Sequence, residues 1–407
     1  MGRTRYAEGE KCETTGPEAQ RRREAVSVRA WPVGVLVGAA AVFAIQTSCA
    51  DHNLAGAVEL PRARTSYVAG VHVLRQSGGR VSWGRARNLI AYDVLGANGY
   101  YEIHIMRPDG SEDSCLTCEK PGLPQRHNGQ PEWHPSGDYV VFQSEQASHP
   151  GRSSEATPGF GRHSDLWIAT SDGQHFYALT EGPRSDDHGV LHPHFSADGK
   201  QLSWSEMYGA PETFTHRGAG GYWRLKVADF GVGADGRPAL NHVRTYEPGG
   251  KALYENHGFS NDGTQLLFSS NYEATKMFQF NAENIYRLEL ATGRVVKLTG
   301  EGYNEHAIVS PNGRKVVWMS SRGNANRGTD YWLMNLDGTD PIRLTHFNDP
   351  DNPMSHGDRL ICADSDWSAD ARHLVGYIQT SLFHQRGMLV MIDFTEAIAH
   401  MAGAADP

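Results

Sequence analysis

One turn motif recurs six times along the chain and constrains the fold more than any other feature. Each copy has an aromatic or apolar residue, a short turn such as Ser-Pro-Asn-Gly, and then a short apolar run; the first copy is degenerate. The spacings between copies are 50, 62, 64, 50 and 58 residues. Regular recurrence on this scale indicates that each copy is one supersecondary unit of a repeat architecture. The copies begin at Trp83, Trp133, Phe195, Phe259, Val309 and Trp367.

Within each copy, further short apolar runs and turns indicate several β-strands. In the copy at Val309, the runs 315–321 and 331–334 precede Asp337-Gly338 and Leu344-Thr345. Asp-Gly and Asn-Gly turns between short β-rich runs are typical of hairpins. We therefore predict an all-β, six-bladed β-propeller of four-stranded antiparallel blades over residues 66–394. Two separate sandwich domains, the alternative, would not explain six copies of one turn.

The two ends of the repeat region suggest how the ring closes. The sixth copy lacks a fourth strand before the C-terminus, and we expect the apolar run at 71–74, upstream of the first copy, to supply it. Helical periodicity is confined to residues 395–401, within a C-terminal tail at 395–407.

The first 49 residues are typical of an export signal, followed by a linker at 50–65. An apolar stretch at 33–45 follows Arg21, Arg22, Arg23 and Arg29, and it is too short to span a bilayer comfortably. Small residues before Cys49 resemble a lipoprotein cleavage box, with ordinary cleavage near Ala50 as the alternative. We expect an exported protein, in the periplasm or as an outer-membrane lipoprotein, with membrane contact only through a lipid on Cys49.

The net charge of the chain and its cysteines indicate which partners and which covalent cross-links to expect. The formal net charge of -9 gives no general attraction to phosphate backbones, so we expect no nucleic-acid partner. In an exported chain, the C-x-x-C pair of Cys115 and Cys118 predicts a small loop disulfide. Cys362 stands alone.

The repeat resembles that of TolB-like, WD-type propellers, whose signature is Trp-Ser-Pro-Asp-Gly, an apolar strand, Asp-x-Tyr, then Asp-Gly and Leu-Thr. The resemblance covers about residues 66–394. It implies the propeller fold and says little about function. We expect a binding scaffold for a periplasmic or cell-envelope protein.

A row of polar residues is expected to face the central channel. In a propeller the innermost strand of each blade lines the channel, and here the turn motif ends that strand. The residue three places before the motif is Gln130, His192, Asn256, His306 or Asp364 in the last five copies. His194 shares a face with His192 if the strand alternates regularly. Glu255 and Glu305 each precede an aligned residue and add carboxylates.

These residue types predict a metal site at the channel mouth. Neutral imidazoles bind borderline transition metals, and Gln or Asp completes a mixed ligand set. We predict His192, His194, His306, Gln130 and Asp364 as ligands of a divalent metal such as Mn, Zn, Ni or Fe. The alternative is a polar channel that binds only ordered water.

A second resemblance is to oligogalacturonate lyases, propellers that typically hold manganese through His and Gln. His192-Pro193-His194 is similar to the His-x-His pair of that family, but Gly189 stands where its Gln ligand would precede the pair. The resemblance implies β-elimination on uronate-containing, acidic oligosaccharides. Under this hypothesis His257 or His188 is the base, and Arg162 clamps a carboxylate.

Overall fold

Hydrogen bonds inside each turn motif explain why it recurs. In the copy at Val309, the Ser310 hydroxyl donates to Asn312 Oδ1 (2.9 Å) and accepts from the backbone N–H of Lys315 (3.0 Å). Gly313 closes the turn with a φ of 74°, a conformation that glycine adopts without steric cost. Ser196, Ser260 and Ser368 bond the acidic residue two places on in the same way. Each copy therefore reverses the chain between two strands.

The computed structural model describes residues 59–403 except for 62, 210–220, 275–281 and 381–386. The predicted export signal, including Cys49, lies outside the described residues. Among the residues that are described, no helix is long and apolar enough to cross a membrane.

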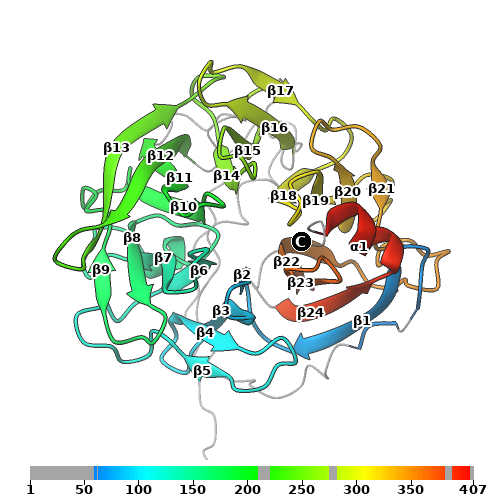
Figure 1. Ribbon diagram of the computed structural model, residues 1–407, viewed down its shortest axis with the longest axis horizontal. Coiled ribbons are helices and arrows are strands. Elements are labelled where there is room, and N and C mark those ends of the chain that lie inside the picture. Colours follow the sequence, from blue (N-terminus) through cyan, green and yellow to red (C-terminus); the bar gives the residue numbers. More distant parts are fainter. Residues whose placement is uncertain (1–58, 62, 210–220, 275–281, 381–386, 404–407) are drawn as a thin grey trace, which may run out of the picture. The chain divides into compact units, whose positions relative to one another are not determined.

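The described strands form six four-stranded antiparallel sheets around a common axis (Figure 1), so the predicted six-bladed propeller is confirmed. The strands nearest the axis are β2, β6, β10, β14, β18 and β22, one from each blade (Figure 1). The blades are β2 to β5 (Val81–Gly84, Leu89–Leu95, Tyr101–Met106, Ser114–Cys115), β6 to β9 (Asn128–Trp133, Tyr139–Glu145, Ser164–Thr170, Phe176–Ala178), β10 to β13 (Gly189–Phe195, Gln201–Gly209, Tyr222–Val232, Pro238–Tyr246), β14 to β17 (Tyr254–Phe259, Gln265–Ser270, Asn284–Glu289, Val295–Lys297), β18 to β21 (Asn304–Val309, Lys315–Ser320, Asp330–Asn335, Ile342–Arg343), and β22 to β24 (Ile361–Trp367, His373–Gln379, Gly387–Phe394) with β1 (Val68–Arg75).

The ring closes by pairing the two ends of the propeller. Strand β1 pairs with β24, and Val71 lies opposite Ile392. This confirms that residues upstream of the first copy complete the sixth blade. Helix α1 (Glu396–Ala402) follows β24, as the periodicity predicted, and buries Ile398 and Ala402.

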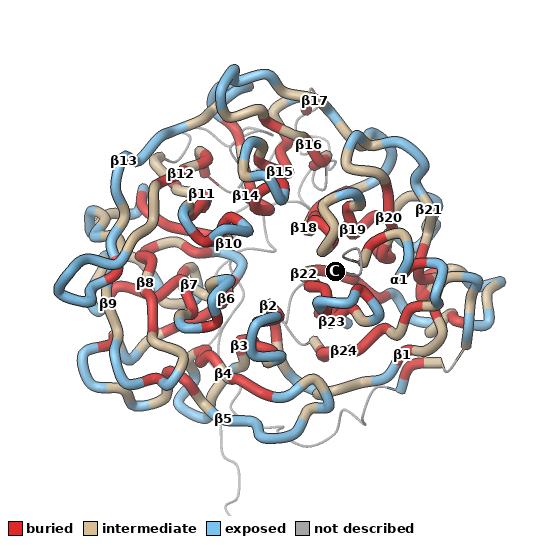
Figure 2. The backbone as a smooth tube through the Cα atoms, in the orientation of Figure 1, coloured by how far each residue is buried: buried red, intermediate tan, exposed pale blue. Residues whose placement is uncertain are grey.

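The core lies between neighbouring blades and buries the aromatic residue of the motif. Trp133, for example, packs with Ile103 of the preceding blade and Val140 of its own blade. Buried residues concentrate on the inner and middle strands, whereas turns and the outer edge are exposed (Figure 2). The predicted disulfide between Cys115 and Cys118 is formed, and Cys362 is free and buried.

Five of the inner strands carry a β-bulge at the position predicted to face the channel. In β10 the pairing register shifts between Leu191 and His194, and β6, β14, β18 and β22 shift within one residue of the equivalent place. Gln130, His192 and His306 adopt positive φ values of 51°, 48° and 51°. A bulge changes the direction of a side chain, so regular alternation does not hold at these residues.

Candidate functional site

Two histidines and a glutamate from three consecutive blades meet in the channel. His192 lies on β10, Glu255 on β14 and His306 on β18, and one ligand atom from each lies within 4.8 Å of the other two. Glu255 contacts His192 Nε2 directly. His192 and Glu255 are buried, and His306 is largely so. Two imidazoles and one carboxylate form a donor set that suits a transition metal.

A third imidazole, that of His257, completes a triangle of rings. Its centroid lies 6.1 Å from that of His192 and 6.0 Å from that of His306. The residue is 2% exposed, and its Nε2 has no hydrogen-bond partner among the described residues. His257 is therefore a buried imidazole with a free ring nitrogen beside the cluster.

Amide side chains from the neighbouring blades fix the position of His192. Gln130 Oε1 accepts a hydrogen bond from the backbone N–H of His192 (3.1 Å), and Gln130 Nε2 lies 3.0 Å from His192 Nε2. Asn256 Nδ2 donates to the His192 carbonyl (2.8 Å). The two hydrogen bonds to its backbone fix the position of His192, whereas the Gln130 amide nitrogen would have to leave His192 Nε2 for a metal to bind that atom.

Asp364, on β22 of the blade next to that of His306, contacts both histidines. Its Oδ1 lies 3.4 Å from His306 Nδ1 and 3.7 Å from His192 Nδ1. Burial opposes a charge on His306, but Asp364 and the nearby glutamates outweigh it and raise the pKa of His306 to about 10. Burial lowers the pKa of His192 to about 3, so this imidazole is neutral and able to bind a metal at neutral pH.

Further carboxylates surround the cluster in a buried setting. Tyr303 donates its hydroxyl hydrogen to Glu305, the residue next to His306. Burial and the proximity of Glu255 raise the pKa of Glu305 well above its usual range, and burial together with Glu305 raises that of Glu283 to about 8. Carboxylates crowded in this way favour either bound protons or a bound cation.

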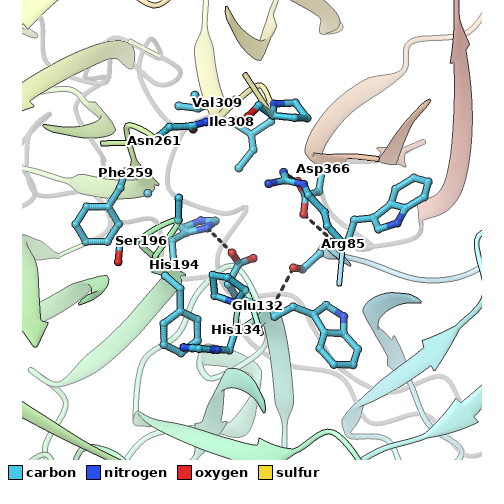
Figure 3. Close-up of a pocket in the computed structure, with 18 of the residues that line it drawn as sticks. Arg85, Glu132, His134, His194, Ser196, Phe259, Asn261, Ile308, Val309 and Asp366 are labelled. Carbon is cyan, nitrogen blue, oxygen red and sulfur yellow. Dashed lines mark hydrogen bonds and ion pairs between the residues drawn. The ribbon is translucent and has the colours of Figure 1, made fainter. Parts of the chain in front are cut away.

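A pocket of about 280 Å³ opens on the face that carries the turn motifs (Figure 3). His257 lines it, which connects the pocket to the histidine cluster. Two ion pairs also lie in its wall: His194 Nδ1 is 3.7 Å from Glu132 Oε1, and Arg85 Nη2 is 2.8 Å from Asp366 Oδ1. His194 points toward Glu132 in Figure 3.

The structure brings together four of the five predicted metal ligands. Gln130, His192, His306 and Asp364 are linked by the contacts given above, whereas His194 belongs to the pocket wall. Because β10 bulges between Leu191 and His194, His192 and His194 have different neighbours.

Of the three predicted catalytic residues, His257 alone lies beside the cluster. His188 precedes β10, and its Nε2 bonds Asp165 Oδ1 at 3.1 Å. Arg162 lies in the loop before β8, where its backbone forms a β-bridge with Gly189.

Arg80 is a buried channel residue that the sequence analysis missed. It stands three places before Trp83, which is the position aligned in the other five copies. Its Nη1 lies 3.7 Å from Asp93 Oδ1, and Asp93 Oδ2 accepts the backbone N–H of Gln130 (2.9 Å). Extending the alignment to the degenerate first copy would have found it.

No protein-family model matches the chain, and no curated protein sequence matches it. Among solved structures, TolB from Acinetobacter baumannii is 14% identical, with a TM-score of 0.48 over 76% of this chain and 65% of that one. This chain thus spans less than two thirds of that TolB structure. A gluconolactonase from Xanthomonas campestris is 14% identical, with a TM-score of 0.49 over 83% of this chain and 95% of its own.

An oligogalacturonate lyase in complex with manganese is 12% identical, with a TM-score of 0.48 over 84% of this chain and 97% of its own. These similarities concern the fold, so the function has to be inferred from the side chains of this chain.

Proposed function

We propose that this protein is an exported binding propeller that holds a divalent transition metal in its channel. The observation that carries the proposal is the convergence of His192, His306 and Glu255 from three blades, with ligand atoms within 4.8 Å of one another. The donors are the types that Mn, Zn, Ni and Fe accept. The metal would present an open position to an acidic oligosaccharide or to an acidic group of a cell-envelope partner.

The surroundings of the three ligands support a cation. His192 is neutral because of its burial, and Gln130 and Asn256 hold it in place. Glu305 and Asp364 flank His306 at 3.5 Å and 3.4 Å, so carboxylate oxygens converge on this imidazole from two blades. A divalent ion bound here would displace the protons that His306 and Glu305 hold.

A second function, metal-dependent elimination on uronate-containing oligosaccharides, is favoured by His257. Its unpartnered Nε2 lies beside the cluster and its residue lines the pocket, which is where a general base would be needed. A bound metal would act as a Lewis acid toward the uronate carboxylate. His257 would take the proton next to the carboxylate while a C=C bond forms and the C–O bond to the leaving sugar breaks, and the leaving oxygen would take a proton from water.

Elemental analysis of protein purified without a histidine tag or chelator tests the first proposal. We expect near-stoichiometric Mn, Zn, Ni or Fe in the wild type and its loss in the double variant His192→Ala, His306→Ala. The double variant His72→Ala, His242→Ala removes two exposed histidines and serves as the matched control. Absence of metal from the wild type, even after reconstitution, would overturn the proposal.

The lyase candidate is tested on the metal-loaded protein with acidic oligosaccharides, by ultraviolet absorbance of the unsaturated product. The expected result is turnover in the wild type and its loss in His257→Gln with metal content retained. Metal binding without turnover would refute the lyase candidate and would leave binding as the only proposed function.

A further inference from the structure

Arg80 carries a guanidinium group that is buried and poorly satisfied. The residue is 8% exposed, and its Nη1 has no hydrogen-bond partner among the described residues. The nearest acidic atom, Asp93 Oδ1, lies 3.7 Å away, beyond hydrogen-bond distance. Arg80 Cζ also lies 5.5 Å from the centroid of the Tyr377 ring, a contact that supplies no hydrogen-bond acceptor in the plane of the guanidinium. A buried guanidinium without hydrogen bonds to the described residues is unfavourable, so it points to a missing acceptor.

A second arginine, the partly buried Arg343, shows what a purely structural role looks like in this protein. Arg343 Nη2 donates to Asp330 Oδ2 at 2.8 Å and to Asn324 Oδ1 at 2.6 Å, and its Nε donates to the Thr345 carbonyl at 2.9 Å. The protein supplies every one of these acceptors. The described residues supply Arg80 with none, although it is buried more deeply.

Asp93 does not supply the hydrogen-bond acceptor that Arg80 lacks. Its Oδ2 is already engaged by the backbone N–H of Gln130, and its Oδ1 has no hydrogen-bond partner among the described residues. Burial raises the pKa of Asp93 to about 6 even though Arg80 opposes this. The two side chains thus form an incomplete pair, which keeps the guanidinium available to another anion.

Arg80 is also coupled to the histidine cluster from two sides. On one side, Asp93 bonds Gln130, which in turn holds His192. On the other, the charge of Asp364, which contacts His192 and His306, acts on the guanidinium. Among the six aligned channel positions, Arg80 alone carries a permanent positive charge.

We propose that Arg80 is an oxyanion subsite that binds the carboxylate of a ligand held beside the His192, His306 and Glu255 cluster. This extends the proposed function and rests on it for the nature of that cluster. A guanidinium offers parallel N–H donors that match the two oxygens of a carboxylate. The ligand class is therefore a small acid or an acidic sugar, positioned with its carboxylate at Arg80.

Binding measurements on the metal-free protein test the subsite without reference to turnover. The probes are D-galacturonate, D-galactose as its neutral counterpart, and inorganic phosphate, titrated by calorimetry. The test variant is Arg80→Met with Asp93→Asn, which removes both charges so that no unpaired Asp93 remains. Arg80→Lys retains the charge without the parallel N–H donors of a guanidinium. Arg107→Met, at an exposed arginine, is the matched control.

We expect the wild type and Arg107→Met to bind D-galacturonate and not D-galactose. The affinity for D-galacturonate should fall by about tenfold or more in the double variant, with Arg80→Lys intermediate. Unchanged affinity in the double variant, equal binding of D-galactose, or no binding by the wild type would overturn the subsite. A fall in D-galacturonate affinity in Arg162→Met rather than in the double variant would also overturn the subsite. Binding of phosphate without binding of D-galacturonate would overturn its assignment to carboxylates.

Metal content separates this inference from the proposed function. Arg80→Lys should retain the metal of the wild type, because Arg80 is not a ligand and Asp93, which bonds the backbone N–H of Gln130, is unchanged in this variant. A wild type that binds metal but shows no Arg80-dependent anion binding refutes the subsite alone. A wild type that binds D-galacturonate through Arg80 but takes up no metal refutes the metal centre alone.

Discussion

Gln130 on β6 holds both the backbone and the ring of His192 on the neighbouring β10. Its Oε1 accepts the His192 backbone N–H at 3.1 Å, and its Nε2 lies 3.0 Å from His192 Nε2. One amide thus fixes the position of the strand through the His192 N–H and contacts the ring nitrogen that Glu255 also contacts. In our account, Gln130 positions the ligand, while His192, His306 and Glu255 supply the donor atoms.

Substitution Gln130→Ala should therefore weaken metal binding more than it weakens the fold. We expect the affinity for Zn²⁺ to fall by about 10-fold to 100-fold, as is typical when a group that orients a ligand is removed. The free energy of unfolding of the metal-free protein should fall by about 1 to 3 kcal/mol, because the His192 N–H is left unsatisfied. Competition with a chromophoric chelator gives the affinity, and Gln174→Ala on an exposed turn is the control. Wild-type affinity in Gln130→Ala would contradict the positioning role.

The metal-free protein should lose stability in alkaline solution because of His306. Burial opposes the charge of His306, but Asp364 and Glu305 raise its pKa from 6.5 to about 10. A raised pKa stabilises the folded state fully below the unfolded value, and this contribution is lost as the pH rises through the folded value. The free energy of unfolding should thus fall from pH 6.5 to about pH 10. Urea unfolding across this range should show a flatter profile in His306→Gln, and an unchanged slope would refute the assignment.

The pairing of β1 with β24 should be essential to the stability of the ring. Val71 is buried opposite Ile392, whereas the next residue, His72, is exposed on the other face. We expect Val71→Asp to lower the free energy of unfolding by about 3 kcal/mol or more, because it buries a carboxylate. His72→Gln should change it by no more than about 0.5 kcal/mol. Equal effects of the two substitutions, measured by chemical denaturation, would argue against the closure.

The disulfide in the first blade should contribute stability without affecting the channel. Cys115 and Cys118 close a short loop, so the chain-entropy relation gives a stabilisation of about 2 kcal/mol. The double variant Cys115→Ser, Cys118→Ser should lose roughly that amount in thermal or chemical unfolding. Its metal content should equal that of the wild type, and a change in metal content would link the two regions.

The blade architecture was predictable because each turn motif is held by hydrogen bonds between residues that are close in the sequence. Ser310, Asn312 and Gly313 bond one another within four residues, so the local sequence suffices to mark the turn. The disulfide and the closing strand followed from spacing and from a missing fourth strand. The disulfide depends on neighbours in the sequence, whereas the closing strand was predictable from the number of strands in the repeat, although Val71 and Ile392 lie at opposite ends of the propeller sequence.

The arrangement of the site was less predictable because it depends on backbone irregularity. Regular alternation placed His192 and His194 on one face, but the bulge in β10 separates their contacts, and the alternation rule cannot anticipate it. The partnership of Glu255 with His192 joins two different blades, and no local pattern encodes it. Arg80 was missed because the first copy lacks a clear turn motif.

Anomalous diffraction from crystals of the metal-loaded protein tests the central claim most directly. Data collected on both sides of the absorption edge of the bound element identify the metal and locate it. The account predicts one strong anomalous peak in the channel, within bonding distance of His192, His306 and Glu255. A peak at another set of side chains, or none in crystals grown with the metal, would contradict it.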